Sequence, residues 1–476
     1  MPFNEILAIL MLVGFFVLLL AGIPVALTLA TTGLVFGYIG FGPLLFNLLP
    51  SRIFGVVTNY TLIAMPLFVF MGVMLEKSKL AEDLMEVIAH AAGKLRGGLG
   101  IGIIVVGVFM GATTGIVGAT VVTLGLLTLP TLLRRGYDKG LACGIICASG
   151  TLGQIIPPSL ILILLADILN ESVGTLFAAA MIPGLMLAGI YVIYILALGI
   201  VRPDMVPAVP KDERDLVSRG QLWAKILRVA LPPVALVGAV LGSIIGGIAA
   251  PTEAASMGAL GAIVVTAIGG RMSWAVLRET TYATTRITAM MMFILMCAQA
   301  FSLSFRGLQG ERLVEDFFAF LPGGINADIW FLMFIIFVLG FFIEWIEISY
   351  IAVPLFLPIF IAAKVDMVWL ATLICVNLQT SFLTPPFGWA LFFLRGVAPP
   401  EITTGDIYRG VVPFVAMQLL ALVICFFFPQ LALWLPRTIG WSKNRENFGM
   451  RCVPAPQLKR GAAAAAPLCI FRSALD

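Results

Sequence analysis

Apolar stretches long enough to cross a lipid bilayer recur along the whole of this sequence. Five of them cover residues 3–41, 98–130, 173–201, 229–269 and 409–436, and a spanning helix needs about 20 mainly apolar residues. Only 11% of the 476 residues are charged, which is less than half of the roughly 25% that is usual in soluble domains. The sequence therefore predicts an all-α polytopic membrane protein with roughly ten to twelve crossings.

The polar stretches are too short for a separate soluble domain. The longest, residues 202–221, is rich in Arg and Lys, and we expect it to be a cytoplasmic linker. The N-terminus lacks the basic region and cleavage site of a signal peptide, so we interpret its apolar run as a first span. Residues 437–476 show no hydrophobic pattern and are predicted to be a disordered tail.

Composition and motifs also argue against several function classes. The formal net charge of +4 gives no reason to expect a nucleic acid partner. The chain has one His and no HExxH, GxGD or GxSG motif beside a usable base, so an intramembrane enzyme is not predicted. Five of the seven cysteines lie in apolar segments, where Cys usually behaves as a small hydrophobe. We expect membrane lipid as the surroundings and no organic cofactor.

The sequence repeats itself once. The spacing from Pro130 to Pro358 is the same as the spacing from the pair Pro157-Pro158 to the pair Pro385-Pro386. Upstream, the offset from Pro24 to Pro251 is shorter than the offset of the other prolines by a single residue. An offset kept over this distance indicates two structural repeats, which we place at residues 1–201 and 222–436.

Charge predicts that the two repeats have opposite orientations in the membrane. Arg134, Arg135 and Lys139 precede the first Pro pair, whereas only Lys364 occupies the matching loop of the second repeat. The positive-inside rule then places the first loop in the cytoplasm and the second outside. Inverted repeats are typical of secondary transporters, which bind their substrates near the midplane at interrupted helices.

Both Pro pairs lie in clusters of Gly and polar residues inside apolar segments. We interpret these clusters as the tips of two re-entrant helical hairpins, near 137–170 and 366–396. Backbone and hydroxyl oxygens at such breaks suit Na⁺, and free helix N-termini suit carboxylates. Proline-kinked core helices, whose Ser and Thr bond the backbone, remain an alternative. The candidate ion- and substrate-binding residues are Ser149, Gly150, Thr151, Gly153, Gln154, Pro157, Pro158 and Ser159 in the first cluster, and Asn377, Gln379, Thr380, Ser381, Thr384, Pro385, Pro386 and Gly388 in the second.

Three acids lie within apolar segments. Glu344 and Glu347 share one helix face, and Glu253 follows Pro251. Ionisable groups at membrane depth are functional candidates by default, so all three are possible coupling acids. A structural role, paired with an Arg such as Arg286 or placed near the interface, stays open.

Gly107, Gly111 and Gly115 recur at four-residue steps. This spacing favours close helix packing in lipid.

Several motifs resemble one transporter family. "RRGYDKGLACGIICASGTLGQIIPPS", "APTEAAS", "IAMPLFVFMG" and "VNLQTSFLTPPFGWALFFLRGVAPP" are similar to the large membrane subunit of tripartite ATP-independent periplasmic (TRAP) transporters, the DctM-like family. The likeness covers about residues 5–436. The chain departs from many members at "TTGIVGAT", residues 113–120, and at "LQTSFLTPP", which bears on the substrate and the individual ligands.

The resemblance implies an elevator-type permease of the bacterial inner membrane. Uptake of a small organic acid would be driven by Na⁺, which is the only metal expected and would bind at the two hairpin tips. A small four-helix membrane subunit and a periplasmic substrate-binding protein would be the partners. A stand-alone sodium/carboxylate symporter of similar fold is the alternative, and a purely structural membrane subunit is a weaker one.

Overall fold

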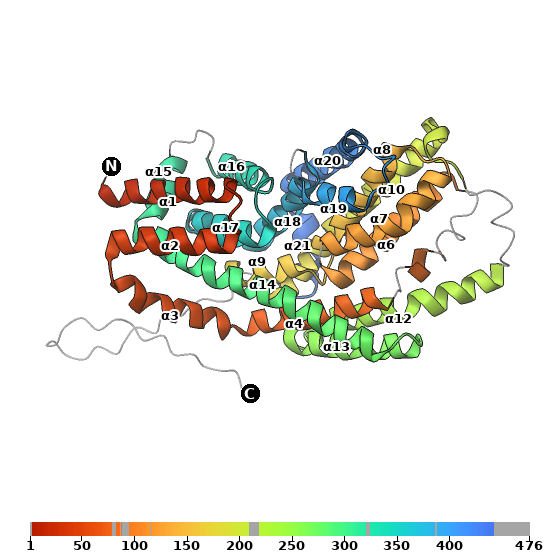
Figure 1. Cartoon of the computed structure of the whole chain (residues 1–476), viewed down its shortest axis with the longest axis horizontal. Coiled ribbons are helices and arrows are strands. Elements are labelled where there is room, and N and C mark those ends of the chain that lie inside the picture. The colour runs from red at the N-terminus through yellow and green to blue at the C-terminus, as the bar shows by residue number, and fades with distance from the viewer. Residues whose placement is uncertain are drawn as a thin grey trace.

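The structure, a computed structural model, is an elongated assembly of helices (Figure 1). It describes residues 2–78, 82–85, 87, 95–115, 117–208, 219–319, 324–385 and 388–441. Residues 209–218 of the predicted linker, residues 442–476 of the predicted tail and Pro386 lie outside this part. Within it, nine helices are long and apolar enough to cross a membrane, which confirms the prediction of an all-α polytopic membrane protein.

The helices follow one another in two similar series. The first series is α1 (Phe3–Leu20), α2 (Val25–Phe41), α3 (Leu44–Val57), α4 (Tyr60–Lys77), α6 (Gly98–Thr114), α7 (Val117–Arg134), α8 (Lys139–Thr151), the 3-10 turn η1 (Leu152–Gln154), α9 (Leu160–Leu169) and α10 (Val173–Val201), followed by the 3-10 turn η2 (Pro203–Met205). The second is α12 (Arg219–Ile245), α13 (Pro251–Ile268), α14 (Trp274–Gly307), α15 (Gly310–Ala319), α16 (Gly324–Leu339), α17 (Trp345–Ala362), α18 (Met367–Leu383), α19 (Trp389–Val397), α20 (Thr404–Phe427) and α21 (Gln430–Thr438).

Matching residues start matching helices. Asp138 caps α8, because its Oδ1 accepts a hydrogen bond from the Leu141 N–H at 2.8 Å. Asp366, the equivalent residue of the second repeat, caps α18 through the Val368 N–H at 3.0 Å. An Asp at this position satisfies amides that the first helical turn leaves free. Residues that match in the sequence repeat, Asp138 and Asp366, therefore begin matching helices in the structure.

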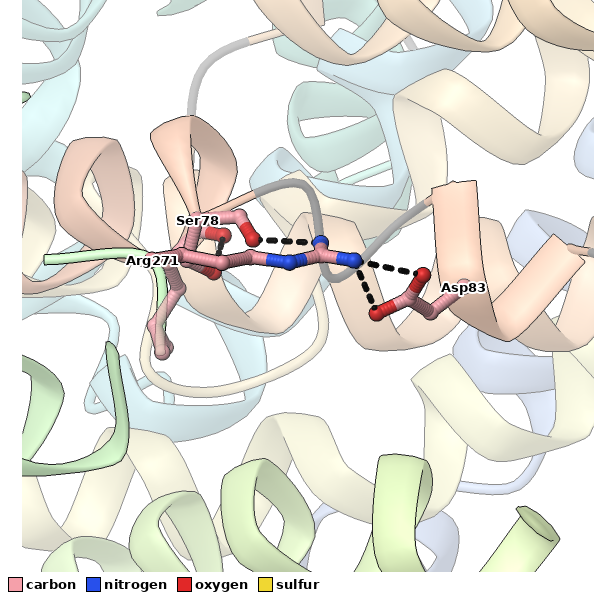
Figure 2. A network of polar contacts seen from close by, with 4 residues as sticks. Ser78, Asp83 and Arg271 are labelled. Atoms are coloured by element: carbon pink, nitrogen blue, oxygen red, sulfur yellow. Dashed lines mark hydrogen bonds and ion pairs between the residues drawn. The ribbon is translucent and has the colours of Figure 1, made fainter. Parts of the chain in front are cut away.

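The two series interlock reciprocally. Helix α2 packs against α14, and α13 packs against α4 (Figure 1). At the first contact the Ser304 hydroxyl donates to the Gly33 carbonyl at 2.6 Å. Near the end of α4, Arg271 donates to the Ser78 carbonyl at 2.7 Å and pairs with Asp83 at 2.8 Å (Figure 2). Each series thus supplies helices that the other one packs on.

Helix α10 shows which ends of the first series lie together. The Gly97 N–H, before α6, donates to Val206 O at 3.0 Å, and the Asp138 N–H, after α7, donates to Met205 O at 3.2 Å. The pair α6–α7 therefore enters and leaves at the end where α10 finishes. The 29 residues of α10 extend about 43 Å, and α9 ends just before α10 begins. The segment α8–α9 consequently crosses from one end to the other.

The second series has the same arrangement from the opposite end. Trp369 Nε1 donates to Cys425 O at 2.9 Å, so α18 begins where α20 finishes. Lys139 donates to Glu401 O at 3.1 Å, so α19 ends near the start of α8. The Trp330 ring lies 4.8 Å from that of Phe426, which places the α16 start beside the α18 start. Thus α16–α17 begins and ends at the side of the molecule where α20 finishes, whereas α18–α19 runs from that side to the opposite one.

This geometry corrects the predicted position of the hairpins. Each repeat has one re-entrant hairpin, as predicted, but these are α6–α7 and α16–α17 rather than the segments near 137–170 and 366–396. Those two segments are spanning helices with an interruption at the Pro pair. The reason is local: a hairpin tip needs only a short reversal, which Gly115 makes with a φ of 62°, whereas a Pro pair interrupts a helix without reversing the chain.

Candidate functional site

Each hairpin tip lies against the break of the following spanning helix. A Cβ added to Gly111 of α6 would lie 2.2 Å from the Cα of Gly153 in η1. In the second repeat, a Cβ at Gly340 would lie 2.1 Å from the Ser381 Oγ in α18. The prediction that the glycines of 107–115 serve close packing is confirmed, and their partner is the helix break.

A cavity of about 370 Å³ lies where the tips and breaks of both repeats meet. Its walls come from the α6–α7 tip, η1, α14, the start of α17, the end of α18, and α19. The lining residues are Gly115, Val117, Gly118, Ala119, Val122, Gln154, Ile287, Met290, Met291, Glu344, Trp345, Ile346, Phe382, Trp389 and Phe393. Of these lining residues, only Gln154 and Glu344 are candidates that the sequence predicts.

The predicted residues of the first cluster are buried around η1. The hydroxyls of Ser149 and Thr151 donate to Ile145 O at 2.5 Å and Ala148 O at 2.9 Å. The Ser159 hydroxyl donates to Gln154 O. Each hydroxyl proton is thus used by the backbone, and the oxygen lone pairs are what these side chains offer to a ligand.

Gly150 packs against α7, since a Cβ there would lie 2.3 Å from Val121 Cγ2. Pro157 and Pro158 follow η1, and the bond between them is cis.

The second cluster is buried except for Thr384 and Pro385, which are half-buried, and its polar groups differ in what they bond. Asn377 donates to Met333 O at 2.6 Å, which ties α18 to α16. Ser381 donates to Leu378 O at 2.8 Å and Thr384 to Thr380 O at 2.7 Å. The amide of Gln379 is fully buried, and neither of its polar atoms has a hydrogen-bond partner among the described residues.

The remaining residues of this cluster form the break itself. The Thr380 hydroxyl donates to Val376 O at 3.3 Å. Pro385 follows Thr384 in the interruption, and Gly388 directly precedes α19. A Cβ at Gly388 would lie 2.6 Å from Phe382 O, so only a glycine fits this approach of the backbone.

Two cysteines join the breaks of the two repeats. The Cys375 thiol of α18 donates to Gln154 O at 3.3 Å, and the Cys147 thiol of α8 donates to Ala390 O in α19 at 3.7 Å. These cysteines occupy equivalent positions of the two repeats, so the contacts are reciprocal. The apolar sequence around each cysteine predicts no more than a small hydrophobe, although both share the offset of the Pro pairs.

The three acids occupy different surroundings. Glu344 lines the cavity at the N-cap of α17. Glu347, on the same helix, is 3% exposed, and its Oε2 has no partner among the described residues. Glu253 is exposed and accepts a hydrogen bond from the Ala250 N–H at 2.9 Å, so it caps α13. We therefore place Glu344 and Glu347, but not Glu253, near the candidate site.

The cavity favours an anion through its backbone rather than its side chains. Val117, Trp345 and Trp389 are the first residues of α7, α17 and α19, and all three line the cavity. Three helix N-termini, each with a partial positive charge, thus converge on it. None of its lining residues among the described part is Lys, Arg or His.

Comparison with known proteins identifies the family. Residues 12–431 match the family described as "Tripartite ATP-independent periplasmic transporter, DctM component". The C4-dicarboxylate TRAP transporter large permease DctM of Pseudomonas aeruginosa is 30% identical over 84% of this chain and 92% of its own. The ectoine/5-hydroxyectoine TRAP transporter large permease UehC of Ruegeria pomeroyi is 30% identical over 90% and 98%.

The fold also has a counterpart among solved structures. The YdaH transporter of Alcanivorax borkumensis superposes with a TM-score of 0.60 at 15% sequence identity, over 92% of this chain and 99% of that one. This similarity concerns the fold alone. The family match over nearly the whole chain carries the assignment, and it agrees with the apolar helices and with the motifs quoted above. The chain belongs to the DctM component family of TRAP transporters, and is thus a multi-pass permease of the bacterial inner membrane and not an enzyme.

Proposed function

We propose that this chain couples the downhill entry of Na⁺ to the uptake of a small organic acid across the inner membrane. It would work with a periplasmic substrate-binding protein and a small four-helix membrane subunit. Relatives are named as large permeases of TRAP transporters for C4-dicarboxylates, ectoine and sialic acid. A bound ion and solute give a reason for two interrupted helices, since unpaired backbone groups in a membrane are costly.

The observation that carries the proposal is the meeting of four interruptions around one cavity. Two are the hairpin tips at Gly115 and Glu344, and two are the breaks at Gln154 and Trp389. One tip and one break come from each repeat. This is the arrangement in which secondary transporters bind substrate between repeats. The helix N-termini at the cavity support a carboxylate as the bound group.

Hydroxyl oxygens at the two helix breaks support Na⁺ as the coupling ion. The hydroxyls of Ser149, Thr151 and Thr384 donate to the backbone and leave only lone pairs for a ligand. Hard cations are bound by such oxygens. The buried carboxyl of Glu347 supplies a negative charge for Na⁺ or for a proton. We keep the residues of both clusters and this acid as the proposed ion site.

The packing supports an elevator movement of one group of helices past another. Helices α8 and α18 pack against α20, and α6 packs against α8. Helices α2, α4, α13 and α14 pack mainly on one another. We propose that the first group, with hairpins and breaks, carries the cavity, and that the second group is the scaffold.

A sodium titration tests the proposal without knowledge of the substrate. An ion that binds only the folded protein stabilises it by RT ln(1 + [L]/Kd). Thermal unfolding of the detergent-purified protein should therefore shift upward with NaCl and saturate, with no equal shift in KCl or choline chloride at the same ionic strength. Identical responses in the three salts, also after co-purification with the small subunit, would contradict Na⁺ coupling.

Uptake into proteoliposomes tests the partners. Under the proposal, uptake requires a Na⁺ gradient, the small subunit and the binding protein together. Uptake that persists without the binding protein and the small subunit would instead establish the stand-alone sodium/carboxylate symporter.

A further inference from the structure

The walls of the cavity are mainly apolar and aromatic. Trp345, Phe382, Trp389 and Phe393 contribute aromatic rings, and most other lining residues are aliphatic or Met. Gln154 and Glu344 are the polar side chains among the lining residues that the structure describes, apart from the indole N–H groups. Such walls bind the apolar part of a ligand by removing it from water.

The charge of the cavity limits how many carboxylates it accepts. The helix N-termini at Val117 and Trp389 offer partial positive charge. Glu344, however, lies in the wall, and no Lys, Arg or His lines the described part of the cavity. A second carboxylate would meet Glu344 with no cationic side chain beside it in the described lining. At an effective dielectric constant of about 20 and a separation of about 5 to 10 Å, this repulsion lowers affinity roughly 15-fold to 300-fold.

The size of the cavity leaves room for a substantial apolar body. An apolar cavity of about 150 Å³ accommodates benzene, and this one measures about 370 Å³. Trp389 Nε1 and Gln154 Oε1 are buried without a hydrogen-bond partner among the described residues. They can serve a single polar group on the ligand.

From these observations we infer that the substrate is a monocarboxylate with a branched or aromatic apolar body, and not a dicarboxylate. The inference rests on the proposed function, because it concerns the same cavity. The carboxylate lies at the N-termini of α7 and α19, and the body packs on the aromatic rings of α17, α18 and α19. Each methylene of the body that leaves water then raises affinity about fourfold.

A ligand series on the full chain, co-purified with its small subunit in saturating NaCl, tests this. The probes are acetate, butanoate, hexanoate, 4-methylpentanoate, phenylacetate and succinate, and dissociation constants come from the rise of the thermal midpoint with ligand concentration. We expect affinity to increase about fourfold per methylene until the cavity is full, and phenylacetate to bind at least tenfold more tightly than succinate.

Two variants connect the result to the cavity. Glu344→Gln should lower the ratio of the succinate to the phenylacetate dissociation constant at least tenfold. Glu315→Gln, at an exposed site on α15, should leave this ratio unchanged. Ala119→Leu adds volume to the wall and should weaken hexanoate and phenylacetate while sparing acetate. This second variant keeps the test valid if Glu344→Gln does not fold.

The outcomes separate this inference from the proposed function. Succinate binding as tightly as phenylacetate, no dependence on chain length, or no binding of any probe would overturn the inference while a Na⁺-specific shift leaves the proposed function standing. If neither Na⁺ nor any carboxylate stabilises the protein, the proposed function fails together with the inference.

Discussion

Replacing Gly111 by Ala tests whether the first hairpin must touch the helix break directly. The added Cβ would lie 2.2 Å from the Cα and 2.5 Å from the nitrogen of Gly153, whereas nonbonded carbon atoms settle at about 3.5–4.0 Å. Both neighbouring atoms belong to the backbone, so hairpin and break must separate by roughly 1.5 Å. Overpacking of this kind costs about 1–3 kcal/mol of stability, and displacing an active group by about 1 Å can lower a rate 100-fold.

We therefore expect Gly111→Ala to lose at least nine-tenths of its uptake in proteoliposomes and to unfold at a lower temperature. Gly189→Ala is the matched control, because an added Cβ at Gly189 of α10 meets nothing within 4 Å. This control should keep full uptake and an equal or slightly higher thermal midpoint. Full uptake by Gly111→Ala, with an unchanged midpoint, would refute the idea that this contact positions the site.

Further predictions concern the ion, the buried acid and the topology. Thr384→Val should reduce the Na⁺-specific stabilisation by about 1.4 kcal/mol for each tenfold loss of affinity, and Thr58→Val, at an exposed hydroxyl bonded to Phe54 O, should not; equal Na⁺ responses would exclude Thr384 from the site. Glu347→Gln should abolish ion-driven uptake while thermal stability is kept or raised, because its buried Oε2 lacks a partner among the described residues; unaltered uptake would make the acid structural. The new thiol of Lys364→Cys should react with an impermeant thiol reagent added outside intact cells, whereas that of Arg134→Cys should react only after permeabilisation. The reverse pattern would contradict the predicted orientation.

The repeated helix starts could be predicted from the sequence because residues with local effects mark them. Asp138 and Asp366 cap α8 and α18 through their own side chains, and the Pro pairs interrupt the helices that follow. These effects need only neighbours along the chain. The constant offset between such marks is therefore visible without a structure, and the prediction of two repeats follows from it.

The position of the hairpins could not be predicted in the same way. Residues 98–130 are apolar apart from a few Thr, and Gly115 is only one of several glycines in this stretch. Whether the chain reverses there depends on packing, namely on Gly111 lying against Gly153. The Pro157-Pro158 pair gave the stronger local signal, but it marks a break and carries no information on the direction of the next helix.

The same limit applies to the cavity, and it affects how ion and substrate can be coupled. Most of its walls are apolar residues of α7, α14, α17 and α19, which look like ordinary span residues until the chain is folded. The breaks that border it are linked by the contacts of Cys147 with Ala390 and of Cys375 with Gln154. A ligand that displaces one break must therefore strain a contact with the other. Since coupling requires that two ligands favour the same arrangement, this reciprocal contact gives the proposed Na⁺ site and the cavity a shared element on which both can act.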